Sequence, residues 1–322
     1  MNFSIVYIFF LIQNNKIASL FFFMTDVAEL TLHVDNRPEM ELRSKIFGHP
    51  GIIVPFKEGL IAKKGALDEE LQFYADYSKW VRKIIPRDLV PEVAGISPSI
   101  SLDCLNSDQK DVVNMKVIRN VANPNHLNKP VLLLRDLASG LERPCVLDVK
   151  LGNRTWELGA QDKAKRRMEK CSETAMTLFF RIRAALWHSE NPDKWPIQDG
   201  INCVTRQFGN NCNREELIDF LRDFLHYPGL VEFFIKKLSK LKKSLLNLRV
   251  EADARMFSTS ILFVYDDAHP ERAECRMLDF AKTYFDIKKK AAQYHERLED
   301  CEDGVIPAIT NMLSILEVIK SS

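Results

Sequence analysis

The centre of the chain carries a segment in which apolar and polar residues alternate, as in a strand packed on one face. Residues 144–152 read PCVLDVKLG, and one face of this strand would carry Cys145, Leu147, Val149 and Leu151. The opposite face would carry Asp148, Lys150 and Gly152. A carboxylate beside an ammonium group is either a partly exposed ion pair or a functional site, and the alternation by itself leaves both interpretations open.

Similar patterns predict further strands and several amphipathic helices along the chain. Strands are expected at 27–34, 59–64, 129–137, 258–267 and 275–283. Helices are expected at 66–84, 161–171 and 213–230, then through Phe234 and Leu248, and finally near 305–319. This order of elements predicts an α+β fold with mostly antiparallel sheets.

The clearest helix is expected at 213–230. Asn213 can cap it, and Glu216 occupies the position of a capping box. We expect Pro228 and Gly229 to stop this helix. The next helix carries lysines on the face opposite its apolar stripe, at positions 236, 237, 240, 242 and 243.

A short segment with Gly140 separates two groups of elements, which predicts two lobes with a hinge near 136–141. The N-lobe is expected at 24–137 and the C-lobe at 138–322. Residues 1–23 form an apolar extension that we expect to lie outside the fold, with Met24 as the working start. A signal peptide or anchor is disfavoured, because no basic segment precedes the apolar run and the run is too short to span a bilayer.

Composition narrows the classes of function. The 322 residues carry a formal net charge of +1, so no overall field favours nucleic acid, and we expect no stable membrane insertion. Seven cysteines are scattered without CxxC or Cys/His metal spacing. An odd number of unpaired thiols favours a reducing compartment, the cytoplasm or the nucleus.

The sequence lacks the glycine-rich loops GxxxxGK[ST] and GxGxxG and the triplets HRD and DFG, which argues against P-loop enzymes, dinucleotide-binding folds and ordinary protein kinases. Asp279 lies at the end of an apolar strand. Phosphoryl transfer needs carboxylates that hold Mg²⁺ and cations that face phosphate, and Lys63, Asp148, Lys150 and Asp279 could supply them. Asp279 could equally be an acid that caps a turn at the strand end.

The expected helix at 161–171 is strongly basic. Its cations lie at i, i+3, i+4 and i+7 and therefore share one face: Lys163, Arg166, Arg167 and Lys170. Such a face is either simply solvated or a surface for a multiply phosphorylated ligand, since both side-chain types suit phosphate oxygens.

Taken together, these segments resemble the inositol polyphosphate kinase family. Its signature PxxxDxKxG is filled by Pro144, Asp148, Lys150 and Gly152. Segments similar to other family motifs follow in the same order: FGHPG (47–51), LIAKK with EELQFY, VLLLRDL, STSILFVYD and RMLDFAKT. The resemblance covers about residues 40–320, is strongest to the inositol hexakisphosphate kinases, and implies a two-lobe kinase-like fold with a helical inositol-phosphate-binding segment near 161–190.

The resemblance also implies roles for individual residues, with ATP and Mg²⁺ as cofactors and an inositol polyphosphate as substrate. Catalysis would fall to Asp148, Lys150 and Asp279, of which Asp279 would hold the metal. ATP would be bound by Lys63, Glu70, Asp136, Leu137 and Asp148, with Glu70 orienting Lys63 and the backbone of Asp136 and Leu137 meeting the adenine. The substrate would be bound by Lys150, Lys163, Arg166, Arg167, Lys170, Ser260 and Lys282.

Some positions depart from the family pattern. Arg135 replaces a hinge glutamate, and Lys282 stands where the family has histidine. The leading hypothesis is phosphorylation of inositol hexakisphosphate to a diphosphoinositol pentakisphosphate. Two alternatives stay open: a multikinase that phosphorylates hydroxyl groups of lower inositol phosphates, and a weakly active scaffold that binds inositol phosphates.

Overall fold

The computed structural model of the chain describes residues 9–13, 16–20, 43, 47, 52–55, 59–96, 131–160, 166 and 172–321. The chain divides into two compact units, Met1–His33 and Val34–Ser322. In the first unit, β1 (Phe9–Gln13) and β2 (Lys16–Leu20) pair as an antiparallel hairpin. The strand expected at 27–34 and most of the basic helix expected at 161–171 lie outside the described residues.

The second unit contains a small antiparallel sheet with the strand order β3-β4-β6-β5. Its strands are β3 (Ile53–Pro55), β4 (Leu60–Lys64), β5 (Val93–Ile96) and β6 (Val131–Arg135). Between β4 and β5 lie α2 (Asp68–Lys79), η2 (Val81–Lys83) and η3 (Arg87–Leu89). These elements fall within residues 24–137, for which the sequence predicts an N-lobe, and the division into lobes stays a prediction.

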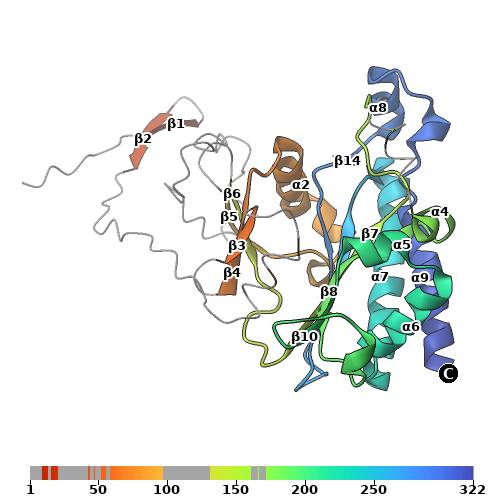
Figure 1. The fold of residues 1–322 in the computed structure, drawn as a ribbon. Helices are drawn as coiled ribbons and strands as arrows, with labels where there is room; N and C mark the ends of the chain where they lie inside the picture. Colours follow the sequence, from red (N-terminus) through yellow and green to blue (C-terminus); the bar gives the residue numbers. More distant parts are fainter. Residues whose placement is uncertain are drawn as a thin grey trace, which may run out of the picture. The chain divides into compact units, whose positions relative to one another are not determined.

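A larger antiparallel sheet with the order β13-β12-β7-β8-β10-β9 forms the rest of this unit. Its strands are β7 (Pro144–Leu151), β8 (Phe180–Trp187), β9 (Ile197–Gln198), β10 (Ile201–Val204), β12 (Ser260–Asp266) and β13 (Ala273–Leu278). The helices α6 (Arg214–Phe224), α7 (Pro228–Ala252) and α9 (Val305–Ser321) cover the face of this sheet that points away from the small sheet (Figure 1). The result is the expected α+β fold with antiparallel sheets.

Shorter elements connect these layers. They are α4 (Glu173–Thr177), η7 (Pro192–Lys194), α5 (Arg206–Asn211), β11 (Arg255–Met256), β14 (Thr283–Tyr284), α8 (Ile287–Gln293) and η8 (Leu298–Cys301). β11 and β14 pair as a separate two-stranded sheet. Within the described part of the chain, no helix is both long enough and apolar enough to span a membrane.

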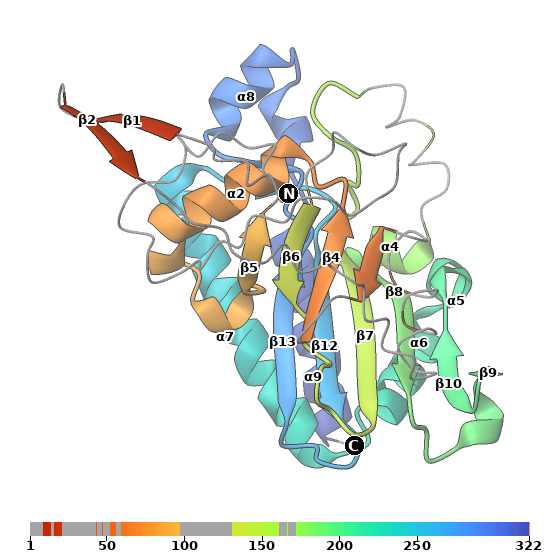
Figure 2. The same ribbon diagram turned by 90° about the vertical axis from the view of Figure 1, so that its left-hand side faces the viewer.

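The alternation in the central strand is confirmed. β7 lies between β12 and β8, as Figure 2 shows, and its apolar face is at most 1% exposed. Asp148 and Lys150 on the other face are partly exposed. Behind the sheet, the indole of Trp187 packs edge-on against Phe220, and Phe234 packs against Phe263. This apolar layer therefore fixes β7 and leaves its charged face toward the small sheet.

Three sequence predictions are corrected by the structure. The segment 66–84 is not one helix, because α2 ends at Lys79 and η2 follows. Pro228 and Gly229 do not stop α6 but begin α7, where the missing proline N–H costs nothing; α6 already ends at Phe224. The strand expected at 275–283 ends at Leu278, because Asp279 has a positive φ of 63°.

Hydrogen bonds between segments far apart in the sequence join the elements around the two sheets. Asp88 of η3 accepts hydrogen bonds from Lys237 and Lys240 of α7, at 2.7 and 2.8 Å. At the end of the hinge segment, Asp266 accepts bonds from the backbone amides of Glu142 and Arg143, both at 2.9 Å. Two of the lysines predicted on α7 thus bind an acid of the N-lobe.

Candidate active site

Lys63 and Glu70 form the N-lobe side of the site. Lys63 lies on β4 and Glu70 in the first turn of α2. The Lys63 ammonium donates a hydrogen bond of 2.7 Å to the Glu70 carboxylate, whose side chain is 2% exposed. The structure therefore brings together the lysine and the glutamate that the sequence pattern paired, and a buried carboxylate orients the lysine.

Asp279 lies on the C-lobe side, directly after β13. Its carboxylate accepts a hydrogen bond of 2.9 Å from Lys63 and a longer contact of 3.5 Å from Lys150. The Lys150 ammonium reaches it from β7, across the end of β12, and also donates to the carbonyl of Ser258. Asp279 thus links one lysine from each sheet, while its own side chain is 44% exposed.

Neighbouring charges set the protonation states of Asp279 and Lys63. Burial alone would raise the pKa of Asp279, but the ammonium groups of Lys63 and Lys150 outweigh it and hold the pKa well below its usual range. Burial opposes the charged form of Lys63 as well, yet Asp279 and Glu70 raise the pKa of this lysine above its ordinary value. At neutral pH the site therefore contains an ionised Asp279 between cations.

Asp148 occupies the middle of β7, and its pKa is shifted in the opposite direction from that of Asp279. Burial raises the pKa of Asp148 to about 6, although the charge of Lys150 partly opposes this shift. Its Oδ1 atom is buried and makes no hydrogen bond of good geometry to a described residue, and the nearby hydroxyl of Ser260 opposes the rise in pKa only partly. A buried carboxylate oxygen with no partner is costly, so this part of the site fits a bound cation or a donor from a ligand.

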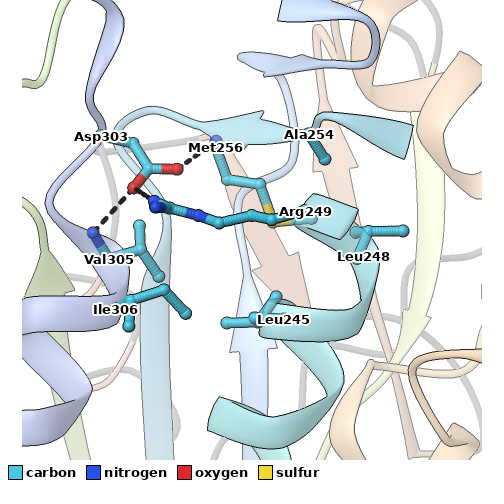
Figure 3. Close-up of a pocket in the computed structure, with 8 residues that line it drawn as sticks. All are labelled: Leu245, Leu248, Arg249, Ala254, Met256, Asp303, Val305 and Ile306. Carbon is cyan, nitrogen blue, oxygen red and sulfur yellow. Dashed lines mark hydrogen bonds and ion pairs between the residues drawn. The ribbon is translucent and has the colours of Figure 1, made fainter. Parts of the chain in front are cut away.

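Gly152, the last residue of the signature, has a structural explanation. Its φ is +77°, and a Cβ atom there would lie 2.1 Å from the carbonyl oxygen of Asp303. The carboxylate of Asp303 accepts bonds from the amides of Met256 and Val305 and from the guanidinium of Arg249, as Figure 3 shows. The backbone that approaches this glycine is thus the chain's own, at the start of α9.

The hinge residues Asp136 and Leu137 follow β6. The backbone amide of Asp136 donates to Gly59, its carbonyl accepts from Ser139, and its carboxylate binds Arg43 at 2.6 Å. Leu137 makes no backbone hydrogen bond to any described residue. Arg135, at the position that departs from the family, has a side chain 68% exposed beside Glu92. The adenine contacts stay a prediction.

The expected substrate residues are only partly described. Lys282 donates to the Thr155 carbonyl at 3.0 Å and contacts Glu157 at 2.8 Å, so it is held by the loop after the signature. Arg166 is helical and exposed, whereas Lys163, Arg167 and Lys170 lie outside the described residues. The basic face therefore stays a prediction from the sequence.

Two groups near the site were missed by sequence reasoning. Glu157, the partner of Lys282, follows the signature without a motif of its own. Arg183 of β8 lies where the β7–β8 pairing shifts its register, and its charge lowers the pKa of Asp148. Only the two arginines of the segment FRIR could have indicated a basic strand beside β7.

The acidic groups suit a metal that is shared with a ligand. Among the described residues, no group of three or more histidine, cysteine or acidic side chains is arranged so that it could hold a metal ion by itself. Mg²⁺ is usually held by one or two carboxylates together with substrate phosphates. Asp279, ionised and half exposed, and Asp148, whose buried Oδ1 atom makes no hydrogen bond of good geometry among the described residues, fit such a shared site.

Sequence comparisons show which known proteins this chain resembles. Mouse inositol hexakisphosphate kinase 3 is 27% identical over 212 residues, which cover 59% of this chain and 50% of that protein. The inositol polyphosphate multikinase of Saccharomyces cerevisiae is 25% identical over 267 residues, or 72% of this chain and 74% of that protein. The chain thus spans about half to three quarters of the length of these relatives.

The fold has a solved counterpart. The crystal structure of the S. cerevisiae inositol phosphate multikinase Ipk2, in complex with ADP and Mn²⁺, superposes with a TM-score of 0.55 at 20% identity. The match covers 81% of this chain and 99% of that one. In addition, residues 131–317 match the family model described as inositol polyphosphate kinase, and this is more than half of the chain. The chain belongs to the inositol polyphosphate kinase family.

Proposed function

We propose that the chain is an ATP- and magnesium-dependent kinase that phosphorylates inositol hexakisphosphate to a diphosphoinositol pentakisphosphate. The observation that carries the proposal is the ionised Asp279 between Lys63 and Lys150, which join the two sheets through one carboxylate. Phosphoryl transfer is mainly a matter of positioning and charge stabilisation. A site with fixed cations and one half-exposed carboxylate supplies both.

Each residue has a role that its position supports. Lys63, oriented by Glu70, faces the nucleotide phosphates, and Asp279 holds the metal together with Asp148. Lys150, which lies on β7 two residues from Asp148 and contacts Asp279, faces the group that is transferred. Bound Mg²⁺ would screen the charge of the phosphates. The backbone of Leu137, which makes no backbone hydrogen bond to the part of the chain that the structure describes, would meet the adenine.

The preference for a highly phosphorylated substrate rests on charge. The predicted basic face carries four cations at 163, 166, 167 and 170, and Lys150 adds a fifth. A trisphosphate would leave several of them without a partner, whereas a hexakisphosphate could pair most. Because the hexakisphosphate has no free hydroxyl, one of its phosphate oxygens attacks the γ-phosphorus, and the bond between that phosphorus and ADP breaks. The attacking oxygen is already deprotonated and needs no general base.

A multikinase that acts on lower inositol phosphates is the second candidate. It is supported by the S. cerevisiae multikinase, for which the matched region covers more of both chains than the mouse hexakisphosphate kinase does. Turnover of the trisphosphate and the hexakisphosphate at matched concentration and moderate salt separates the two. A clear preference for the trisphosphate would contradict the first proposal and support the multikinase.

The basic face is tested by neutralising two of its cations. Arg166→Gln with Arg167→Gln should weaken inositol hexakisphosphate binding at least about tenfold, because each charge-assisted hydrogen bond contributes about 1.5–3 kcal/mol. ADP affinity should stay within about twofold. The matched control removes two cations on α7, Lys236→Gln with Lys243→Gln, and should change neither affinity. Equal losses for both ligands would mean that the face attracts anions in general.

A further inference from the structure

One face of α2 contacts two parts of the site at once. Glu70 and Phe73 are three residues apart and therefore share a face of the helix. Glu70 binds Lys63, as described above. The ring of Phe73, 1% exposed, stacks on the ring of Phe280 with their centroids 3.8 Å apart and their planes 10° apart.

Phe280 is the residue that follows Asp279. It is fully buried, and Tyr74 adds an edge-on contact with centroids 5.6 Å apart and planes at 86°. Two consecutive aromatic residues of α2 thus enclose the side chain next to the carboxylate. The edge-on pair of Tyr74 and Phe280 adds attraction beyond the area that it buries, whereas the nearly face-to-face pair of Phe73 and Phe280 contributes mainly through buried contact.

The backbone of Asp279 is in a conformation that neighbouring contacts can help to fix. Its φ of 63° lies in the left-handed region, which aspartate tolerates but does not require. Its side chain is held only by ammonium groups at the ends of flexible lysine chains, among the residues that the structure describes. The rigid contacts beside it are the buried Phe280 ring and the Phe280 backbone amide, which donates a hydrogen bond to the buried Glu70 carboxylate.

We propose that Phe73 is a positioning residue for the metal-holding carboxylate. Its stack on Phe280 fixes the backbone of Asp279, so α2 sets the positions of Lys63, through Glu70, and of Asp279, through Phe73, together. This inference rests on the proposed function, because it assigns Asp279 to the metal. It adds a residue that touches neither nucleotide nor substrate and that acts through Phe280.

The test compares two buried phenylalanines. Phe73→Leu removes the stack, and the matched control Phe234→Leu removes a fully buried ring that contacts Phe263 behind the large sheet. For each variant, calorimetry measures ADP affinity with and without Mg²⁺, and the melting temperature is recorded. The ratio of the two affinities reports how well the protein holds the metal with the nucleotide.

Both variants should melt earlier, but only Phe73→Leu should lower the magnesium-dependent gain in ADP affinity, at least threefold. Its kcat should fall while KM for the inositol phosphate stays unchanged. Because the rings act as a pair, adding Phe280→Leu to Phe73→Leu should lower the gain no further. Phe73→Met, which keeps more of the buried volume, should show the same loss if the leucine variant folds poorly.

Two outcomes would contradict different parts of this account. An unchanged magnesium-dependent gain in folded Phe73→Leu or Phe73→Met, equal to that of Phe234→Leu, would overturn the positioning role alone. Absence of any such gain in the wild-type protein would overturn the metal assignment of the proposed function, and the positioning role with it.

Discussion

Asp303 and Asp279 are both carboxylates beside cations, but they are held in different ways. The side chain of Asp303 is 3% exposed and accepts bonds from two backbone amides as well as from Arg249. The side chain of Asp279 is 44% exposed, and its contacts among the described residues are the ammonium groups of Lys63 and Lys150. One carboxylate is enclosed by fixed donors, and the other faces solvent between movable ones.

The difference separates a structural acid from an acid that can bind a ligand. Backbone amides of β11 and α9 cannot move without disturbing the fold, so Asp303 is committed to joining these elements. Lysine chains can change rotamer, so Asp279 can exchange part of its contacts for a metal ion. Both Asp303 and Asp279 lie beside cations, so this contact does not distinguish them. They differ in the kind of hydrogen-bond donor that each accepts from and in the exposed fraction of each side chain.

The largest effect on activity is expected for Asp279→Asn. The change removes the metal-holding charge at nearly constant volume, and turnover should fall on the order of 10²–10³-fold. The melting temperature should stay within about 3 °C, because a half-exposed ion pair contributes little to stability. The control is Asp286→Asn, another exposed aspartate with a positive φ, 52°, at the start of α8. Wild-type turnover in Asp279→Asn would remove this residue from the site.

Asp303→Ala should show the opposite pattern. Removing one partner of a buried ion pair costs about 3–5 kcal/mol, and a loss of about 3 kcal/mol lowers the melting temperature by about 6–12 °C in a domain of this size. Turnover per folded molecule, measured well below the melting temperature, should match the wild type. If activity falls as steeply as in Asp279→Asn, the distinction between the two carboxylates is wrong.

Asp148 should give the site an acidic limb in its pH profile. Because burial raises the pKa of Asp148 to about 6, kcat/KM of the wild type should rise with pH, with the midpoint of the rise near pH 6.

The free energy of unfolding should change in the opposite direction. The folded state holds the proton of Asp148 more tightly than the unfolded chain does, so ionisation between about pH 4 and 6 destabilises the fold. Asp148→Asn lacks this loss and should gain stability relative to wild type over that range. No acidic limb above pH 5 would contradict the assignment.

The smallest effect is expected for deletion of residues 1–23. They belong to the unit Met1–His33 and contain none of the residues assigned to the site. The shortened protein should stay soluble, with turnover within about twofold of the full chain and an unchanged melting temperature. Insoluble or inactive protein would show that the hairpin of β1 and β2 contributes to the fold.

The sequence predicted the parts of the molecule that depend on local pattern. Periodicity located β4, β7 and α6, and the capping box of Asn213 and Glu216 is present as expected. The motif order also selected Lys63, Glu70, Lys150 and Asp279, which the structure brings into contact. These signals were readable because each motif is a pattern of a few neighbouring residues, although the motifs themselves lie far apart in the sequence.

Pairings between distant segments could not be read in this way. Nothing near Gly152 indicates that Asp303 approaches it, and nothing near Phe73 indicates Phe280 as its partner. The break in the strand at Asp279 was missed because aspartate tolerates, but does not require, a positive φ. These contacts and this backbone conformation arise only when distant segments pack together in the completed fold. A single sequence gives no local pattern from which such packing can be predicted.

The central claim is tested most directly by following labelled phosphate from γ-labelled ATP onto a series of inositol phosphates, with Mg²⁺ present and products separated by charge. Wild type, Asp279→Asn and Asp303→Ala are compared at equal concentrations of folded protein. The account predicts a labelled diphosphoinositol product from inositol hexakisphosphate with wild type and Asp303→Ala, and almost none with Asp279→Asn. No labelled product from any inositol phosphate with the wild-type protein, or equal product with Asp279→Asn, would contradict it.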